Sequence, residues 1–276
     1  MYERSAAMKL GEKQKKIISI AAGAIVALAI AFAVLIMRID NISTQKSIKA
    51  ASLAEPYIPE FVPSPVEKTN EDASHTVSDE YTFSWFDDAI FIGDSRTEGL
   101  FLYSGIAELT KATPYAIRGF TTFDILGNEK FKSGSKYVTA IEKIKENPNF
   151  SKAYINLGVN ELSPGGSEDF IKRYDEIVCA VLEASPSARI IIQSIIPLTS
   201  FQSSQSSYVN NENTKEFNDA LEKYADEKGF LFLDTCGLLS DTNGALSECY
   251  ALSDGIHLTV DACKKWFDFL CYYTYF

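Results

Sequence analysis

The chain has few residues able to bind a metal ion. Only two of its 276 residues are histidines, His75 and His257, and its cysteines form no CxxC pair. A protein zinc site needs about four such ligands, usually at short spacing along the chain. We therefore predict no metal site and no cofactor.

Disulfide bonds are limited by an odd number of cysteines. Five cysteines leave at least one thiol free. Cys179 and Cys263 fall on apolar faces of predicted helices, where a buried free thiol is ordinary. A bond between Cys236 and Cys249 is the one disulfide that we consider, and the sequence leaves it open.

Positive charge is scarce outside the N-terminus. The net charge is −11, and residues 1–16 alone carry five basic and two acidic residues. The rest of the chain is strongly acidic and repels phosphate backbones. We therefore expect no nucleic-acid partner. No GxGxxG or GxxxxGK loop follows the first predicted strand, which argues against a flavodoxin-like nucleotide or flavin binder.

One long run near the N-terminus lacks charge altogether. Residues 17–37 would reach about 31 Å as a helix, which matches the ~30 Å core of a bilayer. A cleaved signal peptide is the alternative, but its apolar core is only about 7 to 15 residues long. We predict a single transmembrane helix, with the basic residues 1–16 in the cytoplasm and the rest of the chain outside the cytoplasm.

The segment after this run lacks glycine. Residues 38–80 are rich in polar residues and contain the prolines Pro56, Pro59, Pro63 and Pro65. This composition suits a semi-extended extracytoplasmic stalk, although the stretch YIPEFVPSP could instead dock on the following domain. The length of residues 81–276 suits one catalytic domain.

Beyond residue 81, short β-branched or aromatic runs alternate with longer amphipathic ones. This alternation is typical of a parallel sheet covered by helices on both faces, so we predict a three-layer α/β/α sandwich. The predicted strands, about five, are Ala89–Gly93, Tyr115–Arg118, Ala153–Leu157, Arg189–Ile195 and Phe230–Leu233. The predicted helices are Lys136–Glu146, Ser167–Ala184, Asn213–Lys228 and Thr259–Tyr273.

Two segments offer a nucleophile and a base. Ser95 follows the first predicted strand, at the sheet edge where ligands bind in such folds, although Gly-Asp-Ser alone is also a common turn. Asp254 and His257 stand three residues apart before the last helix. A carboxylate can hold an imidazole in the tautomer that activates a serine. Because His75 lies in the polar stalk, His257 is the only good candidate for a base.

Two further segments offer hydrogen-bond donors. Gly119 directly follows the second predicted strand, where a backbone N–H can be presented without side-chain obstruction. Asn160 follows the third strand, with Gly158 permitting the turn, and could direct its amide toward the same edge. Taken alone, each residue is also compatible with an ordinary turn.

These four segments, in this order, resemble the SGNH (GDSL-like) hydrolase family, named after its Ser, Gly, Asn and His blocks. The resemblance spans roughly residues 86–276. It implies that Ser95 is the nucleophile, His257 the general base and Asp254 its orienting acid. It also implies an oxyanion hole made of the backbone N–H groups of Ser95 and Gly119 and the side chain of Asn160.

Neighbouring residues are expected to support these groups. Asp94 should point to the opposite face from Ser95 and hold the turn, and Glu161 should support Asn160 similarly. Arg96 stands where the GDSL motif has leucine. Arg96 could bind an anionic or polyhydroxyl group of the substrate, or it could point away and pair with an acidic residue. We favour the ion pair with an acidic residue.

The expected activity follows from the tether and from one loop. Residues 197–213 follow the fourth strand, are polar and should border the site, which fits a hydroxyl-rich substrate better than a long acyl chain. We expect a membrane-tethered extracytoplasmic serine esterase that removes or transfers short O-acyl groups from cell-envelope carbohydrate. The alternatives are a lipase- or thioesterase-like acylhydrolase acting on lipids, and a non-catalytic envelope-binding module with the same fold.

Overall fold

The computed structural model describes residues 83–273. The predicted cytoplasmic segment 1–16, transmembrane helix 17–37 and stalk 38–80 lie outside the described residues. Among the helices of residues 83–273, none combines the length and the apolar character needed to cross a bilayer.

The centre of the fold is a five-stranded sheet in which every neighbouring pair is parallel. The strand order is β2-β1-β5-β6-β7. All residues of β1 and β5 are buried, as expected for apolar runs covered on both faces. The strands are β1 (Ala89–Gly93), β2 (Thr113–Ala116), β5 (Lys152–Asn156), β6 (Arg189–Gln193) and β7 (Leu231–Leu233). The predicted five-stranded parallel sheet is confirmed.

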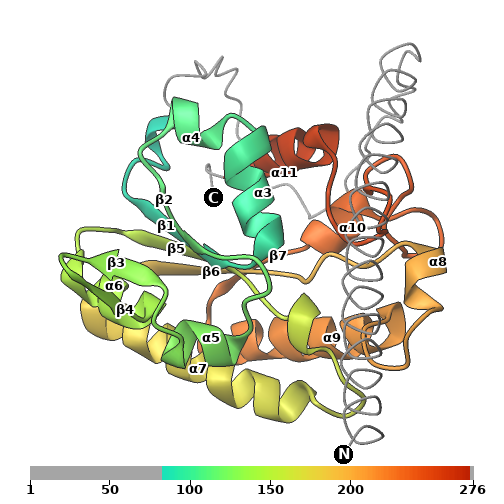
Figure 1. Cartoon of the computed structure of the whole chain (residues 1–276), viewed down its shortest axis with the longest axis horizontal. Helices are drawn as coiled ribbons and strands as arrows, with labels where there is room; N and C mark the ends of the chain where they lie inside the picture. The colour runs from blue at the N-terminus through green and yellow to red at the C-terminus, as the bar shows by residue number, and fades with distance from the viewer. Residues whose placement is uncertain (1–82, 274–276) are drawn as a thin grey trace, which may run out of the picture. The chain divides into compact units, whose positions relative to one another are not determined.

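Helices cover both faces of the sheet (Figure 1). One layer contains α3 (Ser95–Tyr103), α4 (Ile106–Leu109), α10 (Thr235–Leu239) and α11 (Val260–Tyr272). The other contains α5 (Thr122–Gly127), α6 (Ala140–Glu146), α7 (Ser167–Ala184) and α9 (Asn211–Lys228). The short elements are β3 (Phe131–Ser133), β4 (Lys136–Val138), the 3-10 turn η1 (Val159–Glu161) and α8 (Ser200–Ser203).

Two apolar cores lie on the two faces, because successive strand residues point in opposite directions. In β1, Ile90 and Ile92 enter the core beneath α6, α7 and α9, whereas Phe91 enters the core beneath α3 and α11. Trp266 of α11 is fully buried in the second core, and its indole N–H donates to Gln193 at 2.8 Å. The two cores fix α3 and α11 against the same face of the sheet.

One predicted helix starts later than expected. Residues 136–146 divide into strand β4, paired antiparallel with β3, and helix α6. Thr139 ends the strand and caps the helix, because its hydroxyl accepts from the Glu142 N–H while the Glu142 carboxylate accepts from the Thr139 N–H. The segment 197–213, for which no secondary structure was predicted, contains α8 and the first turn of α9.

All five cysteines lie within the described residues, and none of them forms a disulfide bond. Cys236 contacts the Ser240 hydroxyl at 3.8 Å, and Cys249 contacts the Ser247 hydroxyl at 3.2 Å. The structure therefore contains no bond between Cys236 and Cys249. Cys263 is buried as predicted, whereas Cys179 is exposed.

Candidate active site

Ser95 is the first residue of α3 and stands immediately beyond the carboxyl end of β1. A side chain at Gly93 would collide with Thr97, so glycine is needed where helix and strand approach closely. The neighbouring Asp94 caps the helix by accepting the Arg96 N–H at 2.9 Å. The Ser95 hydroxyl is thereby held at the edge of the sheet.

The structure brings Ser95, His257 and Asp254 together from opposite ends of the domain. The Ser95 hydroxyl lies 3.0 Å from Nε2 of His257, and Nδ1 of the same ring lies 2.6 Å from Oδ2 of Asp254. Both distances are those of hydrogen bonds. The imidazole is thus placed between a hydroxyl and a carboxylate.

The turn that carries Asp254 and His257 is held by its own carboxylate. Oδ1 of Asp254 accepts the backbone N–H groups of Ile256 and His257, each at 2.9 Å. Burial alone would raise the pKa of Asp254, but these bonds and the contact with the His257 ring hold it below its ordinary value. The carboxylate therefore stays ionised beside the imidazole.

Residues after β6 pack against this turn. Thr199 donates its N–H to the Gly255 carbonyl at 3.0 Å. Gly255 has a φ of 68°, and a side chain there would collide with the Thr199 hydroxyl and lie 2.7 Å from Gln202 Cβ. Segment 197–213 therefore borders the site, as expected from its position after the fourth predicted strand.

Asn160 and Gly119 are exposed and lie on two loops that contact each other. The Asn160 amide donates to the Phe120 carbonyl at 3.0 Å, and its nitrogen also lies 3.4 Å from Oδ2 of Asp94. Gly119 has a φ of 79° and faces open space. Gly158 has a φ of 133° and packs so closely on Ile195 that no side chain fits there. The two loops that carry the predicted donors are therefore joined to each other.

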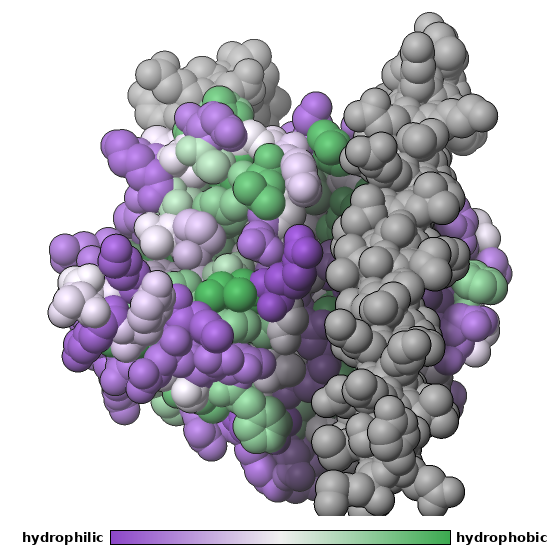
Figure 2. All heavy atoms as spheres, viewed as in Figure 1, coloured by the Kyte–Doolittle hydropathy of each residue, from purple (hydrophilic) through white to green (hydrophobic). Residues whose placement is uncertain are grey.

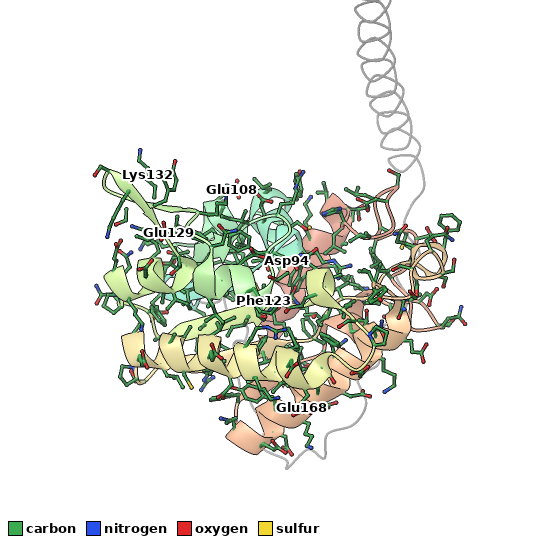
Figure 3. The ribbon with its side chains drawn as sticks, turned by 60° about the horizontal axis from the view of Figure 1, so that its bottom comes forward. Asp94, Glu108, Phe123, Glu129, Lys132 and Glu168 are labelled. Atoms are coloured by element: carbon green, nitrogen blue, oxygen red, sulfur yellow. The ribbon has the colours of Figure 1, made fainter. Side chains whose placement is uncertain are left out.

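Glu161 links the same two loops from behind. Its carboxylate accepts the Thr122 N–H at 2.7 Å and the Thr122 hydroxyl at 2.8 Å, and it pairs with the Arg173 guanidinium at 3.1 Å. The Arg173 guanidinium also lies over the ring of the exposed Phe123, 3.9 Å from its centroid. Figure 3 shows Phe123 on α5 and the outward-pointing Glu168 at the start of α7.

Thr122 and Arg173 were not singled out from the sequence. A local signal could have located the start of α5, because Thr121 and Asp124 have the spacing of a capping box and form one. No local sequence pattern identifies Arg173, because it lies on a different helix, α7. The support expected from Glu161 is present, but it acts on the Gly119 loop rather than on the Asn160 amide.

Asp94 and Arg96 are both buried beneath Ser95, with exposed fractions of 1% and 2%. Burial raises the pKa of Asp94 and lowers that of Arg96 to about 10. The guanidinium donates to three backbone carbonyls, those of Ile196, Pro197 and Ile256. The expected ion pair of Arg96 with an acid does not form, because its hydrogen bonds go to carbonyl oxygens, although the charges of Asp94 and Asp254 still act to raise its pKa.

The polar side chains of segment 197–213 bind the segment's own backbone. The Asn211 side chain accepts the Leu198 N–H and donates to the Leu198 carbonyl, both at 2.8 Å, and the Ser203 hydroxyl accepts the Asn211 N–H. Phe201, by contrast, is 71% exposed on α8. On the face shown in Figure 2, hydrophobic residues lie at the surface among hydrophilic ones. The polarity of this segment is therefore no evidence for a polar substrate.

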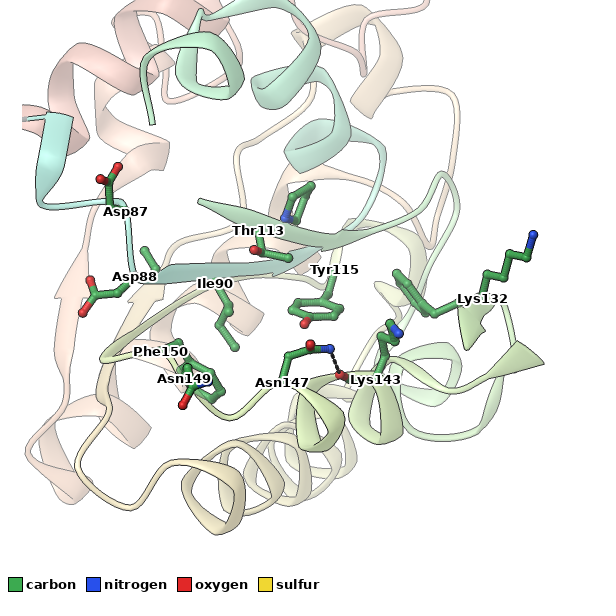
Figure 4. A pocket seen from close by; sticks show the side chains of 13 residues that line it. Asp87, Asp88, Ile90, Thr113, Tyr115, Lys132, Lys143, Asn147, Asn149 and Phe150 are labelled. Carbon is green, nitrogen blue, oxygen red and sulfur yellow. Dashed lines mark hydrogen bonds between the residues drawn. The ribbon is translucent and has the colours of Figure 1, made fainter. Parts of the chain in front are cut away.

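A cavity of about 420 Å³ lies at the amino ends of β1 and β2 (Figure 4). Ile90, Tyr115, Phe150, Asp88 and Asn147 are among the residues that line it. It contains none of the predicted site residues, which gather at the opposite ends of the strands. The cavity is therefore separate from the candidate site around Ser95.

Residues 91–264 match the model of the GDSL-like Lipase/Acylhydrolase family. A comparison with curated proteins found no match.

Solved structures share the fold at low sequence identity. A candidate platelet activating factor from Streptococcus pneumoniae is 23% identical with a TM-score of 0.51, over 68% of this chain and 84% of that one. A candidate acylhydrolase from Bacteroides fragilis is 16% identical with a TM-score of 0.52, over 68% and 86%. A GDSL-like lipase from Bacteroides thetaiotaomicron is 16% identical with a TM-score of 0.50, over 67% and 84%.

Proposed function

Since the chain belongs to the GDSL-like lipase/acylhydrolase family and is an ester-hydrolysing enzyme, we propose that Ser95, His257 and Asp254 form its catalytic triad. The observation that carries this proposal is the continuous contact from the Ser95 hydroxyl through the His257 ring to the Asp254 carboxylate, at 3.0 and 2.6 Å. A serine hydroxyl is a weak nucleophile until a base removes its proton. His257 is the base in reach.

The proposed reaction has two halves. Ser95 Oγ attacks the ester carbonyl while its proton passes to Nε2 of His257, and collapse of the tetrahedral intermediate returns that proton to the leaving alcohol. A water molecule then attacks the acyl-serine ester, with His257 again taking and returning the proton. A sugar hydroxyl attacking instead of water would give acyl transfer. Asp254 holds Nδ1 protonated and stabilises the imidazolium throughout.

We assign the oxyanion hole to the N–H groups of Ser95 and Gly119 and to the Asn160 amide. The Ser95 N–H is at the N-terminus of α3, where backbone N–H groups lack helical acceptors. The Asn160 amide donates one hydrogen to the Phe120 carbonyl. Its nitrogen lies 3.4 Å from Oδ2 of Asp94, which is long for a hydrogen bond, so the second hydrogen could instead be donated to an oxyanion. Such donors act where charge develops and are worth about 10²- to 10³-fold each.

For the substrate we propose short O-acyl groups on cell-envelope carbohydrate, reached by a domain that residues 17–37 tether outside the cytoplasmic membrane. A lipid ester is the second candidate, because apolar side chains are exposed beside the site. Phe201 and Leu252 expose apolar side chains next to the turn that holds Asp254 and His257. Aromatic and aliphatic surface of this kind can contact either a sugar face or an acyl chain.

The test compares wild type with Ser95→Ala, in the full-length chain, on p-nitrophenyl acetate, p-nitrophenyl octanoate and acetylated glycans. Wild type should turn over acetyl esters faster than octanoyl esters, and Ser95→Ala should lose turnover on every substrate. A preference for octanoyl esters would select the lipid candidate. Near-normal turnover by a folded Ser95→Ala variant would overturn the proposed nucleophile.

A further inference from the structure

Arg96 is a buried cation, and each of its three guanidinium nitrogens donates to a main-chain carbonyl. Nε donates to the Ile256 carbonyl at 3.1 Å, Nη2 donates to the Pro197 carbonyl at 3.1 Å, and Nη1 donates to the Ile196 carbonyl. Only 2% of the residue is exposed. A charge withdrawn this far from water is costly unless its hydrogen bonds are made, and here three carbonyl oxygens make them.

These three bonds join parts of the chain that are far apart in sequence. Arg96 follows the proposed nucleophile directly, Ile256 precedes the proposed base directly, and Ile196 and Pro197 lie in the segment that follows β6. That same segment binds the Gly255 carbonyl through the Thr199 N–H. The turn carrying His257 is therefore held to the start of α3 both directly and through a second segment.

We propose that Arg96 is a positioning residue that sets the distance between the Ser95 hydroxyl and the His257 ring, an inference that rests on the proposed triad. The contact between His257 and Asp254 lies within one short turn and is fixed by local bonds. The contact between Ser95 and His257 spans 162 positions in sequence and needs a link between the two segments. The Arg96 guanidinium supplies that link.

The geometry requires a guanidinium rather than another cation. A planar fork with five N–H donors reaches three acceptors in different directions at once, whereas a lysine ammonium is a compact point charge on a flexible stem. A leucine at this position would leave the three carbonyls without their donor. Arg96→Lys keeps the charge and removes the fork, so it is the more informative variant.

The experiment measures kcat, KM, melting temperature and the rate of fluorophosphonate labelling for full-length Arg96→Lys and Arg96→Leu. Arg189→Lys is the matched control, because Arg189 begins β6 at the opposite end of the sheet. We expect Arg96→Lys to lower kcat about 10- to 100-fold with KM changed less than about twofold, since displacement of a reacting group by about 1 Å can cost that much. Labelling should slow in parallel, and Arg189→Lys should behave like wild type.

The outcomes separate a positioning role from a structural one. If Arg96→Lys lowers only the melting temperature, while kcat and labelling per folded enzyme match wild type, the proposal is overturned. A rise in KM at unchanged kcat would also overturn it, because that pattern indicates substrate binding. Should Arg96→Leu fail to fold, Arg96→Lys alone decides. Turnover by Ser95→Ala in the same assays would contradict the proposed triad. Wild-type kinetics of Arg96→Lys would contradict only the role of Arg96.

Discussion

The two ends of the parallel sheet use buried polar groups in different ways. At the carboxyl end, Arg96 and Asp94 bind backbone groups, and the side chains of Ser95 and His257 remain partly exposed. At the amino end, Lys152 is buried against Asp88 and lies over the ring of Trp85. The amino-end charges form a direct ion pair, whereas Asp94 and Arg96 at the carboxyl end attract each other and make their hydrogen bonds to the backbone. The proposed nucleophile and base, Ser95 and His257, lie at the carboxyl end and are partly exposed.

The largest effects should follow changes at the base. His257→Ala should reduce ester turnover by several orders of magnitude, because the hydroxyl then has no proton acceptor. Asp254→Asn should cost about as much or somewhat less, since it disturbs the tautomer and the imidazolium but keeps the nucleophile. Steady-state kinetics with acetyl esters measures both. A folded His257→Ala variant with more than a tenth of wild-type kcat would show that another group acts as base.

A smaller effect is expected at the proposed oxyanion hole. Asn160→Ala should lower kcat about 10²- to 10³-fold with little change in ground-state binding, because one donor to the developing charge is lost. Asn160→Asp is a useful comparison, since it keeps the size of the side chain and puts an acceptor where the donor was. Equal activity of Asn160→Ala and wild type would remove Asn160 from the mechanism.

The link behind the two donor loops should matter less. Glu161→Gln keeps the shape of the side chain but weakens its bonds to Thr122 and Arg173, because charged acceptors bind more strongly than neutral ones. We expect kcat to fall about 3- to 30-fold at similar KM, which is below the cost of removing a donor outright. Glu168→Gln on the exposed first turn of α7 is the control and should have no effect. A matching loss in both variants would contradict the role of Glu161.

The smallest effect on catalysis is expected from a change at the amino end of the sheet. Lys152→Met should leave kcat unchanged and lower the melting temperature by a few degrees at neutral pH. Burial acts to raise the pKa of Asp88, but its bonds to Lys152 and Ser151 bring it below the ordinary value. The stabilisation is therefore present above the unfolded pKa of about 3.9 and is lost as the pH falls through the lower folded pKa. Thermal melts from pH 7 to pH 2 should show the two proteins converging at low pH.

The regular part of the fold could be predicted from local patterns. Buried strands such as β1 are continuous apolar runs, and α7 repeats apolar residues at three- and four-residue spacing, so both were predicted with their observed bounds. The hairpin of β3 and β4 was missed because its strands are only three residues each. Short elements such as α8 bury too little apolar surface to leave a periodic signal.

Parts of the candidate site depended on contacts that no local pattern encodes. The bond from Glu161 to Thr122 spans 39 positions, and the bond from Arg96 to Ile256 spans 160. Composition was also ambiguous for residues 197–213, because the same serines and asparagines can bind a ligand or cap their own backbone. Ser95, Asp254 and His257 could be named as candidates because their chemistry and order resemble a known family.

Chemical trapping of Ser95 tests the central claim most directly. The full-length protein would be treated with a fluorophosphonate probe, digested and mapped by mass spectrometry, with His257→Ala and Ser95→Ala treated in parallel. The account predicts a single modified peptide that carries the probe on Ser95, much slower labelling of His257→Ala, and no labelling of Ser95→Ala. Labelling at another residue, or a wild-type protein that hydrolyses esters without labelling at Ser95, would contradict it.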